Sequence, residues 1–497
     1  MGIIRQTAIV ILLVGLLSPG LLAGGFETTG LGSSARGMAG AFRAIADDWT
    51  AAYYNPAGYA FVYDNQFGTT NGFTHFRHEL TPNYRYTDDL GNLYETGVYN
   101  DRTLYNQHEV HSMPGAGVVA RLPVWGETTF GLSAYQPFDN NLTWTVWEPL
   151  LAYNDSIYDY LPTDQIVNDL DVVAFQLTAA RQFNEDKMAV GIGLQLLRAD
   201  LLLKNIAFRE NPMEGELSDR PYDKIPELVA NDGSGWGFGL KAGMLWKLNE
   251  KTNLALTASL PLSITIEGDA ELRYIMPRNE YSLSEGNPDR YYFGEVEYNF
   301  VRGLPIRLLG SFETELNLPA SFGFGLAYAM SEKLTLALDA EYTMWSSFEG
   351  FEFTYTNLSG LAPELEDDAV TNEFFTADMS YPTEWDNTIK AALGARYLAT
   401  DYLTLVGGVS YDQSPLRDAQ EITPLFVDPG NKLGFSGGII AAIDRWELGL
   451  ITSYVSYSDD ETVGALLDTD NDGVADNFPG TYSANTYETV FTVNYRF

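Results

Sequence analysis

The sequence predicts an all-β protein: a transmembrane antiparallel β-barrel of about fourteen strands, with an N-terminal hatch (plug) inside its lumen. One observation is the strict alternation of the last strand, where aromatic and apolar residues are separated by polar ones: Phe497, Tyr495, Val493 and Phe491 against Arg496, Asn494 and Thr492. The other is a recurrence of paired alternating runs of about ten residues, the length that a tilted strand needs to cross a bilayer. One face of such a strand meets lipid and the other meets water.

Short polar turns set the number of strands. They fall at residues 124–127, 184–187, 249–251, 331–333, 400–402 and 444–445. These hairpins, a first strand near residues 66–76 and the last strand give about fourteen strands, an even number as bacterial barrels require. The longer polar stretches between hairpins, residues 77–109, 141–168, 268–315 and 350–384, are predicted to be extracellular loops. In the strand that begins at Leu334, Asp339 and Glu341 are predicted to face the lumen.

The N-terminal residues do not alternate as strands do. Residues 1–23 combine Arg5 with a short apolar run, which predicts a signal peptide, and cleavage there leaves a mature chain that starts near Phe26. Residues 24–64 are glycine-rich, and we expect them to form the hatch, because the interior of a fourteen-stranded barrel is wide enough to need a plug. Residues 65–497 are then the barrel with its extracellular loops.

Composition excludes several classes of function. A formal net charge of −38 excludes a general nucleic-acid-binding protein, since phosphate binding needs basic patches. The chain has no cysteine, so it has no disulfide framework, thiolate metal site or lipid-anchor cysteine. It also lacks a Gly-x-Ser-x-Gly elbow and an HExxH motif, and its four histidines cluster around the first long loop. The sequence therefore predicts no enzyme and no required cofactor.

A carboxylate pattern in the last extracellular loop is typical of a calcium ligand set or of a plain acidic turn. Its residues are Asp468, Asp470, Asp472 and Asp476, with Gly473 in the turn. Oxygen ligands at alternating positions suit Ca²⁺. Position twelve of this loop is Pro479 instead of glutamate, so we expect a structural calcium site of modest affinity and no complete EF-hand.

Motifs along the mature chain carry a family resemblance. They are Gly25-Phe26, Gly30-Leu31-Gly32, Asn55-Pro56-Ala57, Gly235-Trp236-Gly237-Phe238-Gly239, Leu316-Asn317-Leu318-Pro319 and Tyr411-Asp412-Gln413-Ser414-Pro415. In this order they resemble the FadL/TodX family of outer-membrane transporters of hydrophobic compounds. The resemblance implies a multi-pass barrel in the outer membrane of a Gram-negative-type cell and uptake of long-chain fatty acids or other hydrophobic compounds. It also implies a ligand pocket against the hatch, at Phe26, Asn55, Pro56 and Ala57.

The third strand contains a proline where the wall should be continuous. Thr129 to Tyr135 alternates normally and then meets Gln136, Pro137, Phe138 and Asn140. Proline lacks the N–H that a ladder needs, so it either kinks the strand and opens the wall or simply ends the strand at the extracellular rim. The resembling family has a kink in the same place. We therefore predict lateral diffusion of the ligand through this opening.

Two further groups of residues are candidates for ligand contact. An aromatic and apolar cluster in the second long loop predicts an outer groove or packing against another loop; it contains Trp144, Trp147, Leu150 and Leu151. Family members that take fatty acids place basic side chains near the carboxylate, and the approximate counterparts here are Lys204, Lys241, Lys390 and Arg396. A neutral hydrocarbon or sterol-like ligand stays open.

Other functions and partners follow from the same features. Related barrels with a similar Asn-Pro-Ala-Gly stretch act as components of protein secretion, which is the main alternative, and a general diffusion porin is a second. The expected partners are hydrophobic small molecules, outer-membrane lipid, lipopolysaccharide and the barrel-assembly machinery. We expect a monomer that binds no nucleic acid.

Overall fold

The computed structural model describes residues 25–497 except 84–85, 88–92, 95–99, 101, 108–109, 123–127, 146–165, 185–186, 214–223, 277–294, 302, 417–422, 427–429, 459 and 462–476. The predicted signal peptide and the predicted calcium ligands lie outside the described residues. Within the described part of the chain, no helix is both long and apolar enough to cross a membrane.

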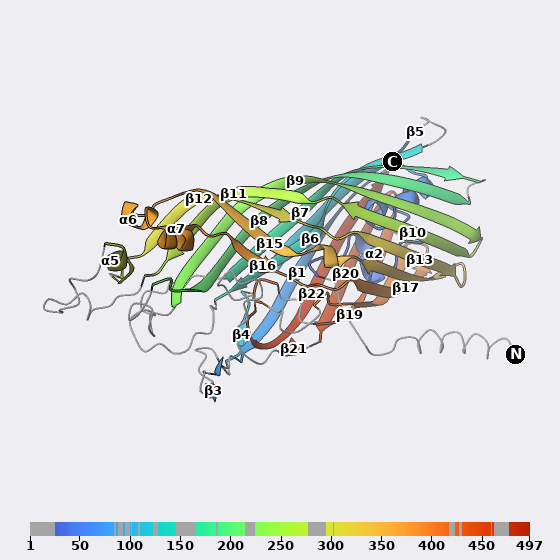
Figure 1. Ribbon diagram of the computed structural model, residues 1–497. Helices are drawn as coiled ribbons and strands as arrows, with labels where there is room; N and C mark the ends of the chain where they lie inside the picture. Colours follow the sequence, from blue (N-terminus) through green and yellow to red (C-terminus); the bar gives the residue numbers. More distant parts are fainter. Residues whose placement is uncertain are drawn as a thin grey trace.

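The strands form one closed antiparallel barrel with 14 positions in its wall (Figure 1). Most positions are single strands: β1 (Gln66–Pro82), β5 (Val110–Leu122), β6 (Thr128–Trp144), β7 (Ile166–Phe183), β8 (Met188–Glu210), β9 (Lys224–Asn249), β18 (Leu403–Asp412), β19 (Lys432–Ile443), β20 (Trp446–Tyr457) and β22 (Gly480–Arg496). The barrel closes where β22 pairs with β1 from Gln66↔Arg496 to Pro82↔Gly480. The predicted barrel is confirmed.

The remaining positions each combine two strands with a break between them. They are β10 (Thr252–Pro261) with β11 (Ile264–Tyr274), β13 (Ser321–Ala329) with β12 (Ile306–Leu316), β14 (Leu334–Thr343) with β15 (Gly350–Ser359), and β17 (Thr388–Thr400) with β16 (Met379–Pro382). Short strands β2 (Tyr86–Thr87), β3 (Leu93–Tyr94), β4 (Leu104–Tyr105) and β21 (Asp460–Glu461) complete the sheet content. In the described part of the chain the predicted hairpin turns join the expected strands; the turn at 124–127 and residues 185–186 of the turn at 184–187 lie outside the described residues.

The wall is longer than the sequence predicted. β8 has 23 residues and β9 has 26, against the roughly ten that a bilayer requires. Along the outer face of β8, apolar Leu194 and Leu196 give way to Arg198, Asp200 and Lys204. The strands thus continue beyond the lipid, into segments that we expected to be loops. There the outer face of the wall is polar because it meets water. The predicted loops 268–315 and 350–384 are therefore wrong in part, since β11, β12, β15 and β16 lie in them.

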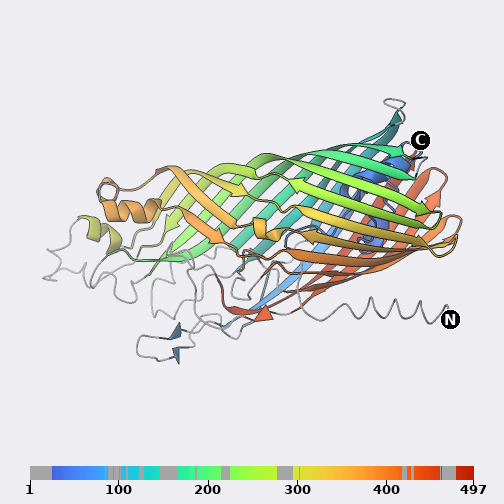
Figure 2. The same ribbon diagram turned by 45° about the vertical axis from the view of Figure 1, so that its right-hand side comes forward.

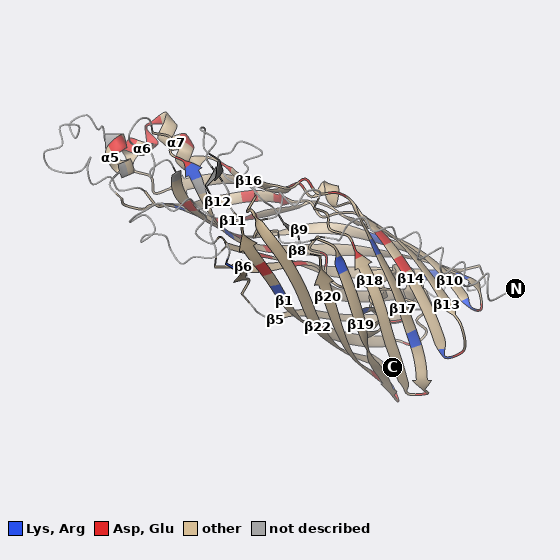
Figure 3. Ribbon diagram, turned by 90° about the horizontal axis from the view of Figure 1, so that it is seen from below, with Lys and Arg blue, Asp and Glu red and all other residues tan. Residues whose placement is uncertain are grey.

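Three short helices lie at the end of this extension, α5 (Glu295–Val301), α6 (Pro363–Glu366) and α7 (Ala369–Thr376) (Figure 1). Acidic residues gather around them in Figure 3, including Glu364 and Glu366 of α6. Phe375 of α7 packs on Phe300 of α5 and on Tyr274 of β11, and all three side chains are buried. This end of the barrel is thus acidic on its surface and aromatic inside.

The N-terminal segment lies within the barrel (Figure 2). It contains α2 (Ser33–Gly37), α3 (Ala51–Tyr54) and the 3₁₀ helix η1 (Pro56–Phe61). Its large side chains Phe42, Trp49 and Tyr59 are fully buried against the wall. The predicted hatch is confirmed, and its compact turns explain why the sequence there lacks strand alternation.

Candidate functional site

Buried ion pairs hold the body of the N-terminal segment to the wall. Arg36 pairs with Glu488 of β22, and Arg43 pairs with Asp339 (3.3 Å) and Glu341 of β14. The carboxylate of Asp339 also accepts the backbone N–H groups of Phe42 and Arg43. The prediction that Asp339 and Glu341 face the lumen is therefore confirmed.

The Asn55-Pro56-Ala57 motif forms a corner of this segment. The Asn55 side chain donates to the carbonyl of Arg43 (2.9 Å) and to that of Met244 in β9 (3.3 Å), and it accepts the N–H of Ala57 (3.1 Å). A Cβ at Gly243 would lie 2.1 Å from the Asn55 side-chain oxygen. Glycine in the wall therefore permits the close approach, and the motif holds the hatch in register with β9. Of the three motif residues, Pro56 lines a small cavity of about 30 Å³.

Phe26 is the centre of an aromatic cluster. Its ring packs edge-to-face on Phe138 of β6 (5.9 Å between centroids), on Trp345 (4.8 Å) and on Phe348 (5.1 Å). Trp385, from the break between β16 and β17, lies 6.0 Å away. Trp345 belongs to the 3₁₀ helix η4 (Trp345–Ser347) in the break between β14 and β15. The sequence predicted Phe26 and Phe138, whereas Trp345, Phe348 and Trp385 come from interruptions of the wall that have no periodic signal.

The strand β6 has an irregularity at the predicted kink. Tyr135 pairs with Ala174, but the next pair is Phe138 with Val172, so Gln136 and Pro137 together face one residue of β7. On its other edge, β6 pairs with β5 only from Thr128 to Ala134. Pro137 thus lies inside the wall, at the point where the β5–β6 ladder stops, and it does not merely end the strand.

Beyond Ala134, where β6 is no longer paired with β5, residues of the N-terminal segment pair with this edge of β6. Glu27 forms an antiparallel bridge with Phe138. The Thr28 N–H donates to the Pro137 carbonyl (3.0 Å), and the Asp139 N–H donates to the Phe26 carbonyl (3.0 Å). The Thr28 hydroxyl adds a bond to the Gln136 carbonyl (2.9 Å). Phe26–Thr28 therefore act as a short piece of strand beside the kink, which the sequence did not predict.

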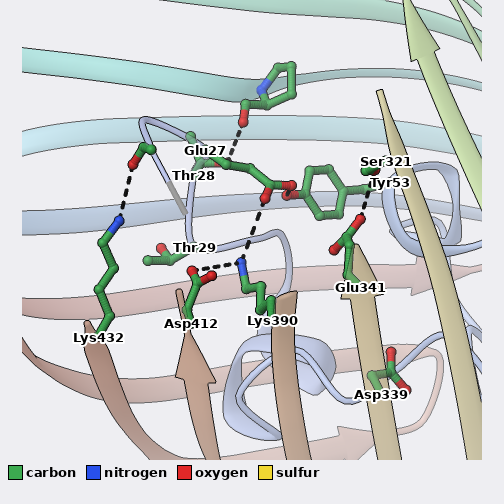
Figure 4. A network of polar contacts seen from close by, with 12 residues as sticks. Glu27, Thr28, Thr29, Tyr53, Ser321, Asp339, Glu341, Lys390, Asp412 and Lys432 are labelled. Atoms are coloured by element: carbon green, nitrogen blue, oxygen red, sulfur yellow. Dashed lines mark hydrogen bonds and ion pairs between the residues drawn. The ribbon is translucent and has the colours of Figure 1, made fainter. Parts of the chain in front are cut away.

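A cavity of about 120 Å³ borders these same residues. Its lining includes Phe26 to Thr29 of the N-terminal segment, Asp139 to Leu142 of β6, Trp385 and Phe426. Figure 4 shows Lys390 placed between Glu27 (3.9 Å) and Asp412 (3.6 Å) on this wall, and Lys432 donates to the Gly25 carbonyl (3.1 Å). The cavity lining combines aromatic rings with charged groups.

The four predicted basic residues have different positions. Lys241 donates to the Tyr53 carbonyl (2.9 Å), Lys390 contacts Glu27, and Arg396 pairs with Asp47 (2.7 Å). These three therefore project into the lumen toward the hatch, and among them Lys390 lines the cavity. Lys204 is exposed on the outer face of β8, far along the wall from the lumen-facing groups.

The remaining candidates are only partly described. Trp144 is fully buried, whereas Trp147, Leu150 and Leu151 lie outside the described residues. Asp468, Asp470, Asp472 and Asp476 also lie outside them, so the calcium site stays a prediction. In the described part of the chain, no group of three or more His, Cys, Asp or Glu side chains could hold a metal ion.

The geometry defines an outer-membrane β-barrel whose lumen is filled by its own N-terminal segment. Residues 15–425 match the family described as outer membrane protein transport protein (OMPP1/FadL/TodX), and the chain belongs to this family of transporters.

Individual relatives are distant in sequence. The long-chain fatty acid transport protein of Escherichia coli O157:H7 is 23% identical over 270 residues, which cover 50% of this chain and 52% of that protein. Outer membrane protein P1 of Haemophilus influenzae is 21% identical over 266 residues, covering 50% and 48%. The chain thus spans about half the length of the curated relatives it matches.

Solved structures share the fold over almost the whole chain. A FadL homologue of Pseudomonas aeruginosa superposes with a TM-score of 0.70 at 18% identity, covering 95% of this chain and 99% of that one. The toluene transporter TodX of Pseudomonas putida gives a TM-score of 0.66 at 16% identity, covering 94% and 99%.

Proposed function

We propose that this protein takes up hydrophobic compounds across the outer membrane and releases them sideways through the wall between β5 and β6. Family membership supports transport, and the relatives named for long-chain fatty acids and for toluene suggest the class of ligand. The observation that carries the route is the edge of β6, where Phe26–Thr28 take the place of a wall strand.

The physical argument starts from backbone polar groups. In contact with lipid, an unpaired N–H or C=O is costly, so a barrel wall stays closed wherever a partner is available. Beside Pro137 the partner is a detachable piece of chain, whose Phe26 side chain also lines the cavity. A ligand that displaces Phe26 from the cavity therefore removes the partner of β6 and opens the gap.

The outer face of the wall supports an exit at this point. An apolar groove of about 750 Å³ lies there, lined among others by Val118 of β5, Leu132 of β6 and Phe175 of β7. Val118 and Leu132 form a pair in the last stretch of the β5–β6 ladder, just below the gap. A hydrophobic ligand that leaves the gap would pass onto apolar surface and then into the outer leaflet, without crossing the aqueous periplasm.

The decisive variant removes one residue from the kink. Deleting Pro137 leaves Tyr135, Gln136 and Phe138 opposite Ala174, Val173 and Val172, so the bulge disappears and β6 can pair continuously. Pro137→Val is the matched control, because it restores an N–H and keeps the extra residue. We expect the deletion to lower uptake of a radiolabelled fatty acid by cells at least about tenfold, and the control to retain most of it.

The amount of folded barrel in outer-membrane fractions must be equal for both variants and the parent. Parent-level uptake by the deletion variant would refute the lateral route and favour passage past a displaced hatch. Failure of the parent protein to take up any hydrophobic compound would refute the transport function itself.

A further inference from the structure

A turn in the connection between β18 and β19, Thr423–Phe426, reaches across the lumen. Its Leu425 carbonyl accepts the side-chain N–H of Asn140 in β6 (3.2 Å) and that of Asn168 in β7 (2.9 Å). In the wall, β20, β22, β1 and β5 lie between β19 and β6. Leu425 and Phe426 are buried. The turn therefore bridges distant parts of the wall through the interior of the barrel.

The Phe426 ring packs on side chains that come largely from breaks in the wall. Its centroid lies 5.7 Å from that of Phe348, 5.8 Å from that of Phe351 and 6.1 Å from that of Trp385. Phe348 lies in the break between β14 and β15, and Trp385 lies in the break between β16 and β17. These breaks turn aromatic rings inward, and the rings form a seat for the turn.

The turn lies between two cavities. Phe426 borders the cavity of about 120 Å³ beside the hatch. Thr423 to Leu425 border a second cavity of about 40 Å³, together with Asn205 of β8 and Tyr381 of β16. Both of these residues belong to the part of the wall that rises beyond the lipid. The turn thus separates the extracellular end of the barrel from the cavity beside the hatch.

The turn is attached less firmly than a wall strand. Within the described residues, its hydrogen bonds to the wall all reach one atom, the Leu425 carbonyl oxygen, whereas wall strands pair along their length. Its seat also buries polar atoms that have no hydrogen-bond partner in the described part of the chain, Asn168 Oδ1 and Trp385 Nε1. Unpaired buried polar atoms are unfavourable, and water reaches them once the turn moves away. The closed position is therefore only weakly favoured.

We propose that Thr423–Phe426 is an outer gate, latched by Asn140 and Asn168, which opens to admit ligand from the extracellular side and closes behind it. This inference rests on the proposed uptake of hydrophobic compounds, and it adds control of access to the cavity. Phe26 lines the same cavity beside the kink, so the cavity has a gate toward the outside and another toward the exit. Ligand can then enter without the lumen being open from end to end.

The latch is tested without ligand, by labelling single cysteines in purified protein with a water-soluble maleimide, since the chain has no cysteine of its own. Ser410→Cys reports on the cavity that Ser410 lines, and Ser34→Cys reports on the buried hatch. Asn140→Leu and Asn168→Leu each remove one donor to the Leu425 carbonyl. Asn71→Leu is the matched control, because the Asn71 side chain bonds Ser112 and does not contact the turn.

We expect each latch variant to raise the labelling rate of Ser410→Cys about fivefold, and the double variant to raise it at least about tenfold. The labelling rate of Ser34→Cys in the latch variants, and both rates in Asn71→Leu, should stay within about twofold of the parent. An unchanged rate at Ser410→Cys in the double variant would overturn the gate. An equal rise at both reporters, or an equal rise in the control, would overturn it as well, because the whole barrel would then have loosened.

A second measurement holds the gate shut. Phe351→Cys and Phe426→Cys replace two rings that are stacked 5.8 Å apart, and the two thiols are bridged by dibromobimane. Bridging should lower cellular uptake of a radiolabelled fatty acid at least about tenfold, whereas each single-cysteine variant treated in the same way should retain most of it. Full uptake after bridging would overturn the gate. If the parent takes up no hydrophobic compound, the proposed function fails, and the labelling rates still decide whether the turn opens.

Discussion

The first residues of the N-terminal segment and its body are attached to the barrel in different ways. Phe26–Thr28 are held by backbone hydrogen bonds to β6, by packing of the Phe26 ring and by one long ion pair, Glu27 to Lys390 (3.9 Å). The body, from Ser33 to Phe61, is held by buried ion pairs such as those of Arg36 and Arg43. Removing one partner of a buried pair costs about 3–5 kcal/mol, whereas a single hydrogen bond contributes about 0.5–1.5 kcal/mol net. The first residues can therefore detach while the body stays in place.

The largest expected effect comes from deleting both the first residues and most of the body of the N-terminal segment. Deletion of residues 25–57 should leave a folded barrel, because the strands pair with one another around the whole circumference. Water would then fill the lumen, and single-channel conductance in planar bilayers should rise on the order of tenfold. A deleted barrel with parental conductance would contradict the assignment of this segment as a plug.

A pair of substitutions separates the two attachments. Arg43→Met leaves Asp339 and Glu341 without their partner and should loosen the body, whereas Thr28→Pro removes the N–H that donates to Pro137 and the hydroxyl that donates to Gln136. The chain has no cysteine, so a buried Ser34→Cys can report on the body through its rate of maleimide labelling. We expect the labelling rate to increase about 100-fold with Arg43→Met and less than about twofold with Thr28→Pro. Similar increases in both variants would mean that the segment moves as one unit.

The barrel could be predicted from the sequence because alternation and turn residues are local signals. The strand that begins at Leu334 shows both, and its alternation predicts that its acidic residues face the lumen. Local signals do not predict the extended wall, for a physical reason. Phe351, Glu352 and Phe353 alternate as a strand does, but a strand with a charged outer face is unstable in contact with lipid. Outside the bilayer the same alternation is stable, and only pairing with a neighbouring strand reveals it.

The candidate site was predictable only in part. Phe26 and Pro137 carry local signals, an N-terminal aromatic residue and a missing N–H. The contact between these two regions carries no local signal, because the bridge between Glu27 and Phe138 joins residues far apart in the sequence. The same holds for Arg36 and Glu488, which lie on opposite ends of the chain. Such contacts depend on how the hatch folds inside the barrel, and no period in the sequence encodes them.

The smallest expected effect concerns a charge within the body. Asp48 is buried, and its carboxylate accepts the Thr50 N–H (2.8 Å) ahead of α3. Burial, followed by the neighbouring Asp47 carboxylate, raises the pKa of Asp48 to about 7. An acid whose pKa is raised on folding contributes its stability below its unfolded value of about 4, and loses it as the pH rises through the folded value.

Asp48→Asn keeps an oxygen that can accept the Thr50 N–H but carries no charge at any pH. The stability of the body should therefore differ little between the variant and the parent at pH 4. The difference should grow as the pH rises to 8.5. At that pH the variant should be more stable by about 1.4 kcal/mol or more, since each pKa unit corresponds to that amount. Protection of Ser34→Cys from labelling at the two pH values measures the difference. A parent whose protection is independent of pH, or a variant that loses protection at pH 8.5 as the parent does, would show that the attachment of the body does not depend on this carboxyl.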